Sequence, residues 1–181
     1  MKQYLFLFYF CFILLVFYGR SEYDVIFDKG EIKTKVDIVF QYSSAASKSD
    51  GNALAYYIDS IVSGKDGSKQ KNIALQAYID LLTIQEDIYN NYLTSMDKEH
   101  FYFYPVKKYD SINLSEEQKK KRRLIKDLSV KEIAQEKAVY GKFLGTLFSG
   151  QDVKCVKEKA LIAYEKMLDK LKKEVDMLNS K

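Results

Sequence analysis

The chain contains SGKDGSKQKNIALQAYIDLL at residues 63–82, and this stretch aligns without gaps with SGQDVKCVKEKALIAYEKML at residues 149–168. Nine of the twenty aligned positions are identical, where average composition gives roughly one or two by chance. Upstream, apolar residues within 57–62 meet apolar residues within 143–148 at the same offset of 86. The sequence therefore predicts two copies of one helical unit, since repeated supersecondary units commonly build a helical core.

The residues shared by the two copies are typical of turns and packed helix faces. Ser-Gly predicts the end of a helix, since Gly adopts positive φ past the last turn. Asp66 and its counterpart Asp152 can cap the helix that follows or offer charge to its N-terminus. Ala74, Tyr78 and Leu82 stand at i, i+4 and i+8, which predicts one packed face. We expect these to be packing positions and not ligand positions.

Apolar periodicity extends the helical prediction over much of the remaining chain. It predicts a short helix at residues 52–62, a long helix ending near Ser95, and a final helix from residue 152 almost to residue 181. One Pro and eight Gly also favour long helices. The expected fold is mostly α, a helical bundle or short solenoid of two duplicated helical hairpins at about residues 52–95 and 130–180.

Two serines precede a Gln or Glu by three residues, which is the spacing of a capping box. Ser115 with Gln118 predicts a helix start, and Ser129 with Glu132 predicts a helix start or a bend within one long segment. The basic run KKKRR at residues 119–123 is expected to be the solvated start of a helix. Contact with phosphate or anionic lipid is the minor alternative for this run.

An N-terminal segment at residues 22–51 precedes the predicted helical domain at 52–181. Apolar and polar residues alternate over 32–42, which predicts a strand. Residues 25–27 and the turn after them could pair with this strand as a small β-hairpin. A helix is the open alternative. The small polar stretch SSAASKSDG at residues 43–51 is predicted to be a linker.

Residues 1–21 have the pattern of an export signal. Lys2 precedes fifteen uncharged, mostly apolar residues at 4–18, which fit the n-region and h-region of a secretory signal. A membrane-spanning helix needs about 20 such residues. Cleavage is expected after Ser21, and an uncleaved signal anchor is the alternative. Cys11 lies inside the apolar run, so it is not expected to carry a lipid.

Charge and cysteine content narrow the classes of function. Without Lys2 and Arg20 the chain has 27 basic and 25 acidic residues. A nucleic-acid-binding face usually needs a strong basic excess, so nucleic acid is not an expected partner. After signal cleavage Cys155 is the one remaining cysteine, so an intramolecular disulfide is excluded and packing must stabilise the domain.

No motif in the sequence predicts catalysis, a cofactor or a metal. His100 is the only histidine, which excludes zinc sites built on several histidines. Cys155 is expected to be a partly buried small residue and not a reactive thiol. Gly64 and Gly67 lack the Lys and hydroxyl residue of a phosphate-binding loop. We therefore expect a protein that is not an enzyme.

One aromatic stretch is the candidate partner-binding surface. It consists of Phe101, Tyr102, Phe103 and Tyr104, in a segment expected to be irregular. Exposed aromatic side chains there could bind a partner or a bilayer interface. The favoured alternative is that these rings pack on the bundle or pair with the predicted strand at residues 32–42, because large apolar side chains usually find cover.

The pattern A-L-x-A-Y-x-x-x-L at residues 74–82 and 160–168 resembles the second helix of a tetratricopeptide hairpin. Leu144-Gly145 with Phe148 resembles that family's first helix. The spacing departs from the family, because the copies are 86 residues apart and the family's repeats are about 34 residues long. The resemblance implies a scaffold that binds peptides or partner proteins, without catalysis.

These features predict an exported, non-catalytic helical module that binds another protein of the cell envelope or surface. The first alternative is a small-ligand-binding protein or enzyme with a pocket between the hairpins, formed by Tyr and carboxylate groups. A second alternative is a structural envelope protein tethered to the membrane through residues 4–18.

Overall fold

A computed structural model describes residues 29–94 and 105–180, and within these ranges it contains helices, turns and irregular connections but no strand. The mostly α fold is therefore confirmed. The helices are α2 (Lys29–Tyr42), α3 (Ser44–Val62), α4 (Ser68–Thr94), α5 (Glu116–Leu128), α6 (Val130–Phe148) and α7 (Lys154–Asn179).

The chain divides into two compact units, Met1–Asp37 and Ile38–Lys181. Residues 29–37, the first part of α2, are the described portion of the first unit. The second unit begins within α2 and holds all the other helices. It therefore contains both copies of the predicted repeat.

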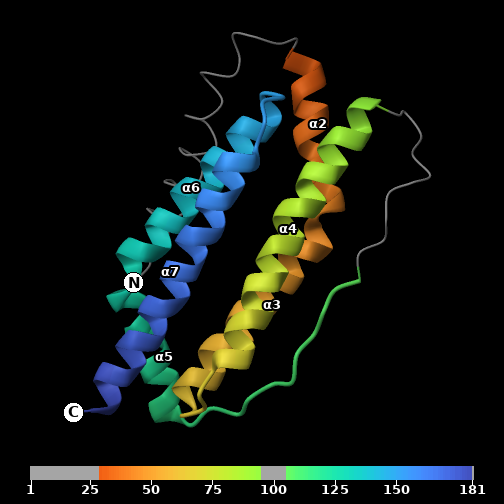
Figure 1. The fold of residues 1–181 in the computed structure, drawn as a ribbon. Helices are drawn as coiled ribbons and strands as arrows, with labels where there is room; N and C mark the ends of the chain where they lie inside the picture. Colours follow the sequence, from red (N-terminus) through yellow and green to blue (C-terminus); the bar gives the residue numbers. More distant parts are fainter. Residues whose placement is uncertain (1–28, 95–104, 181) are drawn as a thin grey trace, which may run out of the picture. The chain divides into compact units, whose positions relative to one another are not determined.

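Two antiparallel helical hairpins form the second unit, as the repeat predicts. Helix α3 packs on α4, and α6 packs on α7. Contacts between α4 and α7, and between α3 and α7, join the two hairpins (Figure 1). A bundle of two duplicated hairpins is thus the observed arrangement.

The turns of the two hairpins have matching hydrogen bonds. Gly64 and Gly150 have φ values of +87° and +70°, and each follows the serine that ends a helix. The Gly64 N–H donates to the carbonyl of Ile61, and the Gly150 N–H donates to that of Leu147. Positive φ at these positions favours Gly because a Cβ would be strained there.

The two aspartates in the turns place their charge at the starts of the helices that follow, as predicted, although the N-cap of α7 is Val153. Asp66 accepts a hydrogen bond from the Ser68 N–H at 3.2 Å, and Asp152 accepts one from the Lys154 N–H at 2.9 Å. Ser68 and Lys154 are the first residues of α4 and α7. Each carboxylate thus meets one of the N–H groups that a helix start leaves without a partner.

The structural repeat extends further upstream than the aligned sequences. Ser43 lies between α2 and α3, and Ser129 lies between α5 and α6, again 86 residues apart. The Ser43 N–H donates to the Val39 carbonyl, as the Ser129 N–H donates to the Ile125 carbonyl. Both serines are buried. Each copy therefore consists of a helix, a bend and a hairpin.

At the N-terminal ends of α5 and α6, the two predicted capping boxes differ. Ser115 accepts from the Gln118 N–H, and the Gln118 side chain accepts from the Ser115 N–H. This capping box is confirmed. A helix does start after Ser129, at Val130, as one of the two predicted alternatives had it, but Ser129 makes no side-chain cap and the capping box is not formed.

The predicted strand at residues 32–42 is wrong, because these residues lie in α2. Its alternating pattern does not match burial: Val39 is in the core, whereas Phe40 and Tyr42 are exposed. The linker predicted at 43–51 is also wrong, because α3 begins at Ser44. Residues 25–27, the other half of the predicted hairpin, lie outside the described residues.

Candidate functional site

Two tyrosines and two carboxylates form a symmetric arrangement inside the bundle. The Tyr164 hydroxyl donates to Asp50 at 2.9 Å, and the Tyr78 hydroxyl donates to Glu136 at 2.7 Å. Asp50 and Glu136 are 86 residues apart, as are Tyr78 and Tyr164. Each copy therefore supplies a tyrosine to the carboxylate of the other copy. We call these four residues the crossed pairs.

The two tyrosines of the crossed pairs also stack on each other. The ring centroids of Tyr78 and Tyr164 are 4.0 Å apart, and the planes differ by 5°. Both side chains are in the core. The prediction that Tyr78 and its counterpart pack on a helix face is therefore confirmed, and their hydroxyls have an additional role as hydrogen-bond donors.

Burial changes the acid–base properties of the crossed pairs. It raises the pKa of Asp50 to about 6, with a hydrogen bond from Tyr164 acting against this shift and the negative charge of Glu136 adding to it. Burial also raises the pKa of Glu136, against the hydrogen bond from Tyr78. The pKa values of both tyrosines are raised by burial and by the nearby carboxylates. Their hydroxyls therefore stay protonated and act as donors.

A second polar cluster breaks the symmetry of the two copies. The Gln85 amide donates to the Tyr140 hydroxyl at 2.8 Å, and that hydroxyl donates back to the Gln85 carbonyl oxygen at 3.1 Å. The Gln85 amide also approaches the Ser43 hydroxyl at 3.4 Å. At the corresponding positions the other copy has Leu171, Leu54 and Ser129. This difference accounts for the buried Ser129 hydroxyl, which has no hydrogen-bond partner within the described part of the chain.

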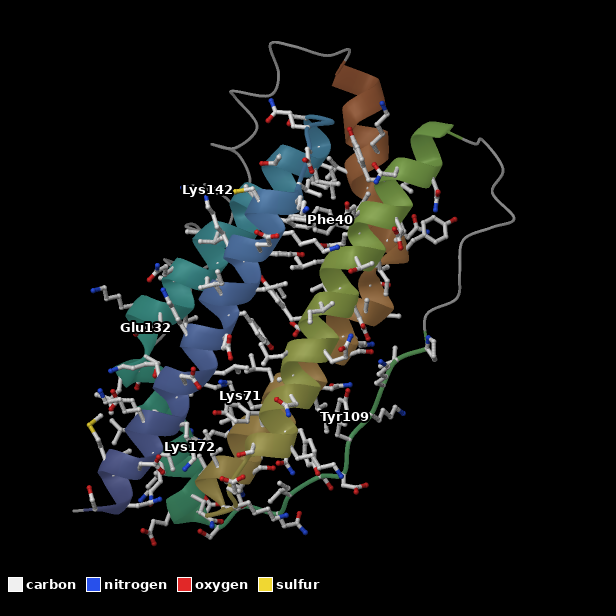
Figure 2. All side chains as sticks on the ribbon, in the orientation of Figure 1. Phe40, Lys71, Tyr109, Glu132, Lys142 and Lys172 are labelled. Atoms are coloured by element: carbon white, nitrogen blue, oxygen red, sulfur yellow. The ribbon has the colours of Figure 1, made fainter. Side chains whose placement is uncertain are left out.

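Two equivalent lysines join the hairpins at the surface. Lys71 of α4 contacts Asp169 at 2.6 Å and Glu165 at 3.2 Å, both on α7 (Figure 2). Its counterpart Lys157 of α7 contacts Glu86 at 2.7 Å on α4. These partly exposed pairs contribute little individually, but they join the two copies as the buried pairs do.

The chemistry available to the crossed pairs is proton holding and hydrogen bonding. Tyr78 and Tyr164 are each about 2% exposed and Glu136 is 9% exposed. Every hydroxyl of the crossed pairs is already directed at a carboxylate. The four residues thus bind one another and specify how the two copies fit together.

Other sequence predictions concern the aromatic stretch at residues 101–104, Cys155 and the absence of a metal site. Phe101, Tyr102, Phe103 and Tyr104 lie outside the described residues. Cys155 is exposed on α7, so the prediction of a partly buried side chain is wrong. Among residues 29–94 and 105–180, no group of three or more His, Cys, Asp or Glu side chains could hold a metal ion.

Sequence reasoning missed Asp50, Glu136, Gln85 and Tyr140. Asp50 fell within the predicted linker, and Glu136 resembles any acidic residue of a solvated helix. The offset of 86 was the one signal available, because extending it upstream pairs Asp50 with Glu136.

No family model, curated protein or solved structure matches this chain.

Proposed function

We propose that this protein is a non-catalytic helical module that binds another protein of the cell envelope or surface. The observation that carries the proposal is an apolar surface at the junction of α5 and α6. Leu124, Leu128 and Val130 are 44%, 45% and 59% exposed. Met177 of α7, the helix that packs on α5, is exposed as well.

Helical geometry places the two leucines together. Leu124 and Leu128 are one turn apart and therefore share a face of α5. Val130 follows at the start of α6, beyond the bend at Ser129. Large apolar side chains that are scattered singly need no explanation, whereas a group of them favours an interaction site. We name Leu124, Leu128 and Val130 the α5–α6 apolar surface.

The interior of the bundle supports a non-catalytic role. Its carboxylates and tyrosines are paired with one another, and all of them except the half-buried Asp50 are buried. Such groups stabilise one arrangement of the hairpins and are not presented to a substrate. The weak tetratricopeptide likeness of the sequence agrees with binding, but no comparison supports membership of that family.

Site-specific photocrosslinking tests the proposal. A photoreactive residue at position 128 is expected to form adducts with a discrete partner in native envelopes. The matched control is position 162, because Ile162 is 53% exposed but lies on α7 away from the α5–α6 apolar surface. Adducts at 128 should disappear in Leu124→Ser. Equal labelling at both positions, or no adduct at 128, would contradict the proposal.

The crossed pairs favour a second candidate, a small-ligand-binding protein or enzyme. Two carboxylates with raised pKa values converge with tyrosine hydroxyls between the hairpins, which is a typical sign of a functional site. A thermal-shift screen of small molecules on the wild-type protein and on Glu136→Gln distinguishes the two candidates. A ligand that stabilises only the wild type would support the second candidate.

The proposed location is outside the cytoplasm, through the signal at residues 1–21, with tethering as the alternative. These residues lie outside the described ranges. Within the described ranges, no helix combines the length and apolar character that a membrane span requires. The mass of the protein purified from its native source tests export directly. An N-terminus at Glu22 indicates release, and one at Met1 with recovery in membranes indicates a signal anchor.

A further inference from the structure

A basic cavity lies between α3, α5 and the segment that precedes α5. Its volume is about 380 Å³, which is within the usual range for small-ligand sites. Helix α5 contributes Lys119, Arg122, Arg123 and Lys126 to the lining, and α3 contributes Asp59. Residues 112–114 form another part of the wall.

The positive charges in this cavity exceed the negative charges. Four cations and one carboxylate line the cavity. The carboxylate, Asp59, is paired with Arg122 at 2.9 Å. Lys119 has a partner outside the lining, Glu116, at 2.7 Å. Among the described residues, no carboxylate is within ion-pair distance of Arg123 or Lys126. Burial and the neighbouring Arg122 lower the pKa of Lys126, as expected where cations crowd together.

Helical spacing explains why these cations gather. Residues 119, 122, 123 and 126 are three or four positions apart, so they lie on one face of α5. Leu124 and Leu128 lie on roughly the opposite face, at about 100° of rotation per residue. The cavity is therefore distinct from the α5–α6 apolar surface.

The fold does not require this charge. At the offset of 86, Arg122, Arg123 and Lys126 correspond to Val36, Asp37 and Phe40, and Asp59 corresponds to Gly145. Helix α2 of the first copy thus forms without this group of cations. A cluster of like charges destabilises a fold unless something compensates for it, which favours a role in binding an anion.

We propose that this cavity binds a phosphate-bearing ligand, with Arg123 and Lys126 supplying its charged contacts. Arg matches the oxygens of phosphate with paired N–H groups, and Lys adds a point charge. Arg122 lies within ion-pair distance of Asp59, at 2.9 Å and without hydrogen-bond geometry. The proposal goes beyond the proposed function, since it concerns a different face of α5 and a different class of ligand. The phosphate could belong to a soluble ester or to a lipid headgroup.

Titration of the full-length protein with two probes tests the proposal. The soluble probe is inorganic pyrophosphate, followed by calorimetry. The membrane probe is phosphatidylcholine vesicles with and without phosphatidylglycerol, followed by cosedimentation. The test variant is Arg123→Gln/Lys126→Gln. The control variant, Lys120→Gln/Lys131→Gln, removes the same charge from exposed positions that do not line the cavity.

The wild type and the control are expected to bind alike, and the test variant should bind roughly tenfold or more weakly, since two charge-assisted contacts are lost. Loss confined to pyrophosphate identifies a soluble phosphate ligand, and loss confined to phosphatidylglycerol vesicles identifies a headgroup. The proposal is overturned if neither probe binds, or if both variants weaken binding equally. Circular dichroism of each variant establishes that it is folded.

Discussion

At the residue scale, the hydroxyl groups of Tyr78 and Tyr164 are the hydrogen-bond donors on which the two carboxylates of the crossed pairs depend. Each donates to a carboxylate from the other copy. A buried carboxylate that loses its donor keeps its full desolvation penalty, whereas an exposed one recovers hydrogen bonds from water. Removing a donor from the crossed pairs should therefore lower the stability of the fold more than removing one from an exposed hydrogen-bonded pair.

Tyr78→Phe tests this sensitivity. It keeps the ring that stacks on Tyr164 and removes the donor to Glu136. We expect the free energy of unfolding to fall by about 1–3 kcal/mol, measured by urea denaturation. Tyr56→Phe is the control, because the Tyr56 ring stacks on Tyr109 at the less buried edge of α3. Similar losses in the two variants would show that the hydroxyl of Tyr78 has no special role.

The raised pKa of Asp50 predicts how stability depends on pH. Its pKa rises from an ordinary value of 3.8 to about 6 in the fold, so the folded state holds a proton that the unfolded state releases. This stabilisation is complete below about pH 4 and is lost as the pH rises through about 6. The loss is at most about 3 kcal/mol.

Urea unfolding between about pH 4 and pH 7 measures this dependence. The wild type should become less stable as the pH rises, and Asp50→Asn should show a shallower slope, since it cannot ionise. The slope does not vanish in this variant because Glu136 also has a raised pKa. The assignment is wrong if the variant and the wild type have the same slope.

At the element scale, small residues decide where α3 begins. Four small side chains are buried at spacings of three and four, namely Ser43 just before the helix and Ala46, Ser49 and Ala53 within it. They form a helical face built from small residues. The composition of this face resembles that of a linker, so the sequence predicted that the domain begins only at residue 52. The hairpin turns were predictable because Gly and Asp identify them directly. A face of Ser and Ala carries no such signal before its partner helix is known.

The two equivalent bends differ in whether their serine is paired. Ser43 approaches the Gln85 amide at 3.4 Å, whereas the buried Ser129 hydroxyl has no hydrogen-bond partner among the residues that the structure describes. Ser129→Ala should therefore leave stability unchanged or raise it by up to about 1 kcal/mol, and Ser43→Ala should lower it by about 0.5–1 kcal/mol. Thermal unfolding of the two variants side by side checks the difference. We explain the unpaired Ser129 hydroxyl by Leu171, which stands in the second copy where the first has Gln85. Equal effects of the two substitutions would contradict this explanation.

Two glycines in the first copy should respond oppositely to alanine. Gly67 precedes α4 with φ +80°, and a Cβ there would lie 2.4 Å from Ile61 Cγ2. Gly51 lies within α3, and no heavy atom of the described residues comes within 4 Å of its Cβ position. We expect Gly67→Ala to destabilise by at least about 1 kcal/mol and Gly51→Ala to stabilise by about 0.5–1 kcal/mol. Chemical denaturation measures both, and a stabilised Gly67→Ala would contradict the turn geometry.

At the scale of the whole molecule, the repeat explains both what the sequence predicted and what it did not. Alignment predicted two hairpins, because the residues that turn and pack within a copy are conserved between the copies. The crossed pairs escaped prediction because each joins a residue of one copy to a residue of the other. Asp50 has no recognisable role until Tyr164 is placed beside it. Contacts between copies therefore required the structure, although the offset of 86 was already visible.

The contacts between copies predict that neither half of the second unit folds well alone. Tyr57 donates to the Leu168 carbonyl at 2.9 Å, and Tyr78 stacks on Tyr164. Separating the chain between residues 110 and 111 would expose these groups to water. Each half should then show little cooperative unfolding by circular dichroism, and equimolar mixing should restore it, because association stabilises the folded form by mass action.

The symmetry of the two copies also predicts that the first half, residues 22–110, associates with itself. In a two-fold dimer of this half, Tyr78 of one molecule would meet Asp50 of the other, as Tyr164 meets Asp50 in the intact chain. We expect concentration-dependent self-association in sedimentation experiments, weakened by Tyr78→Phe and displaced by the second half. The second half carries Glu136 and Tyr164, so it can form both crossed pairs with the first. A first half that folds cooperatively as a monomer would show that the copies are independent domains and that the crossed pairs do not hold them together.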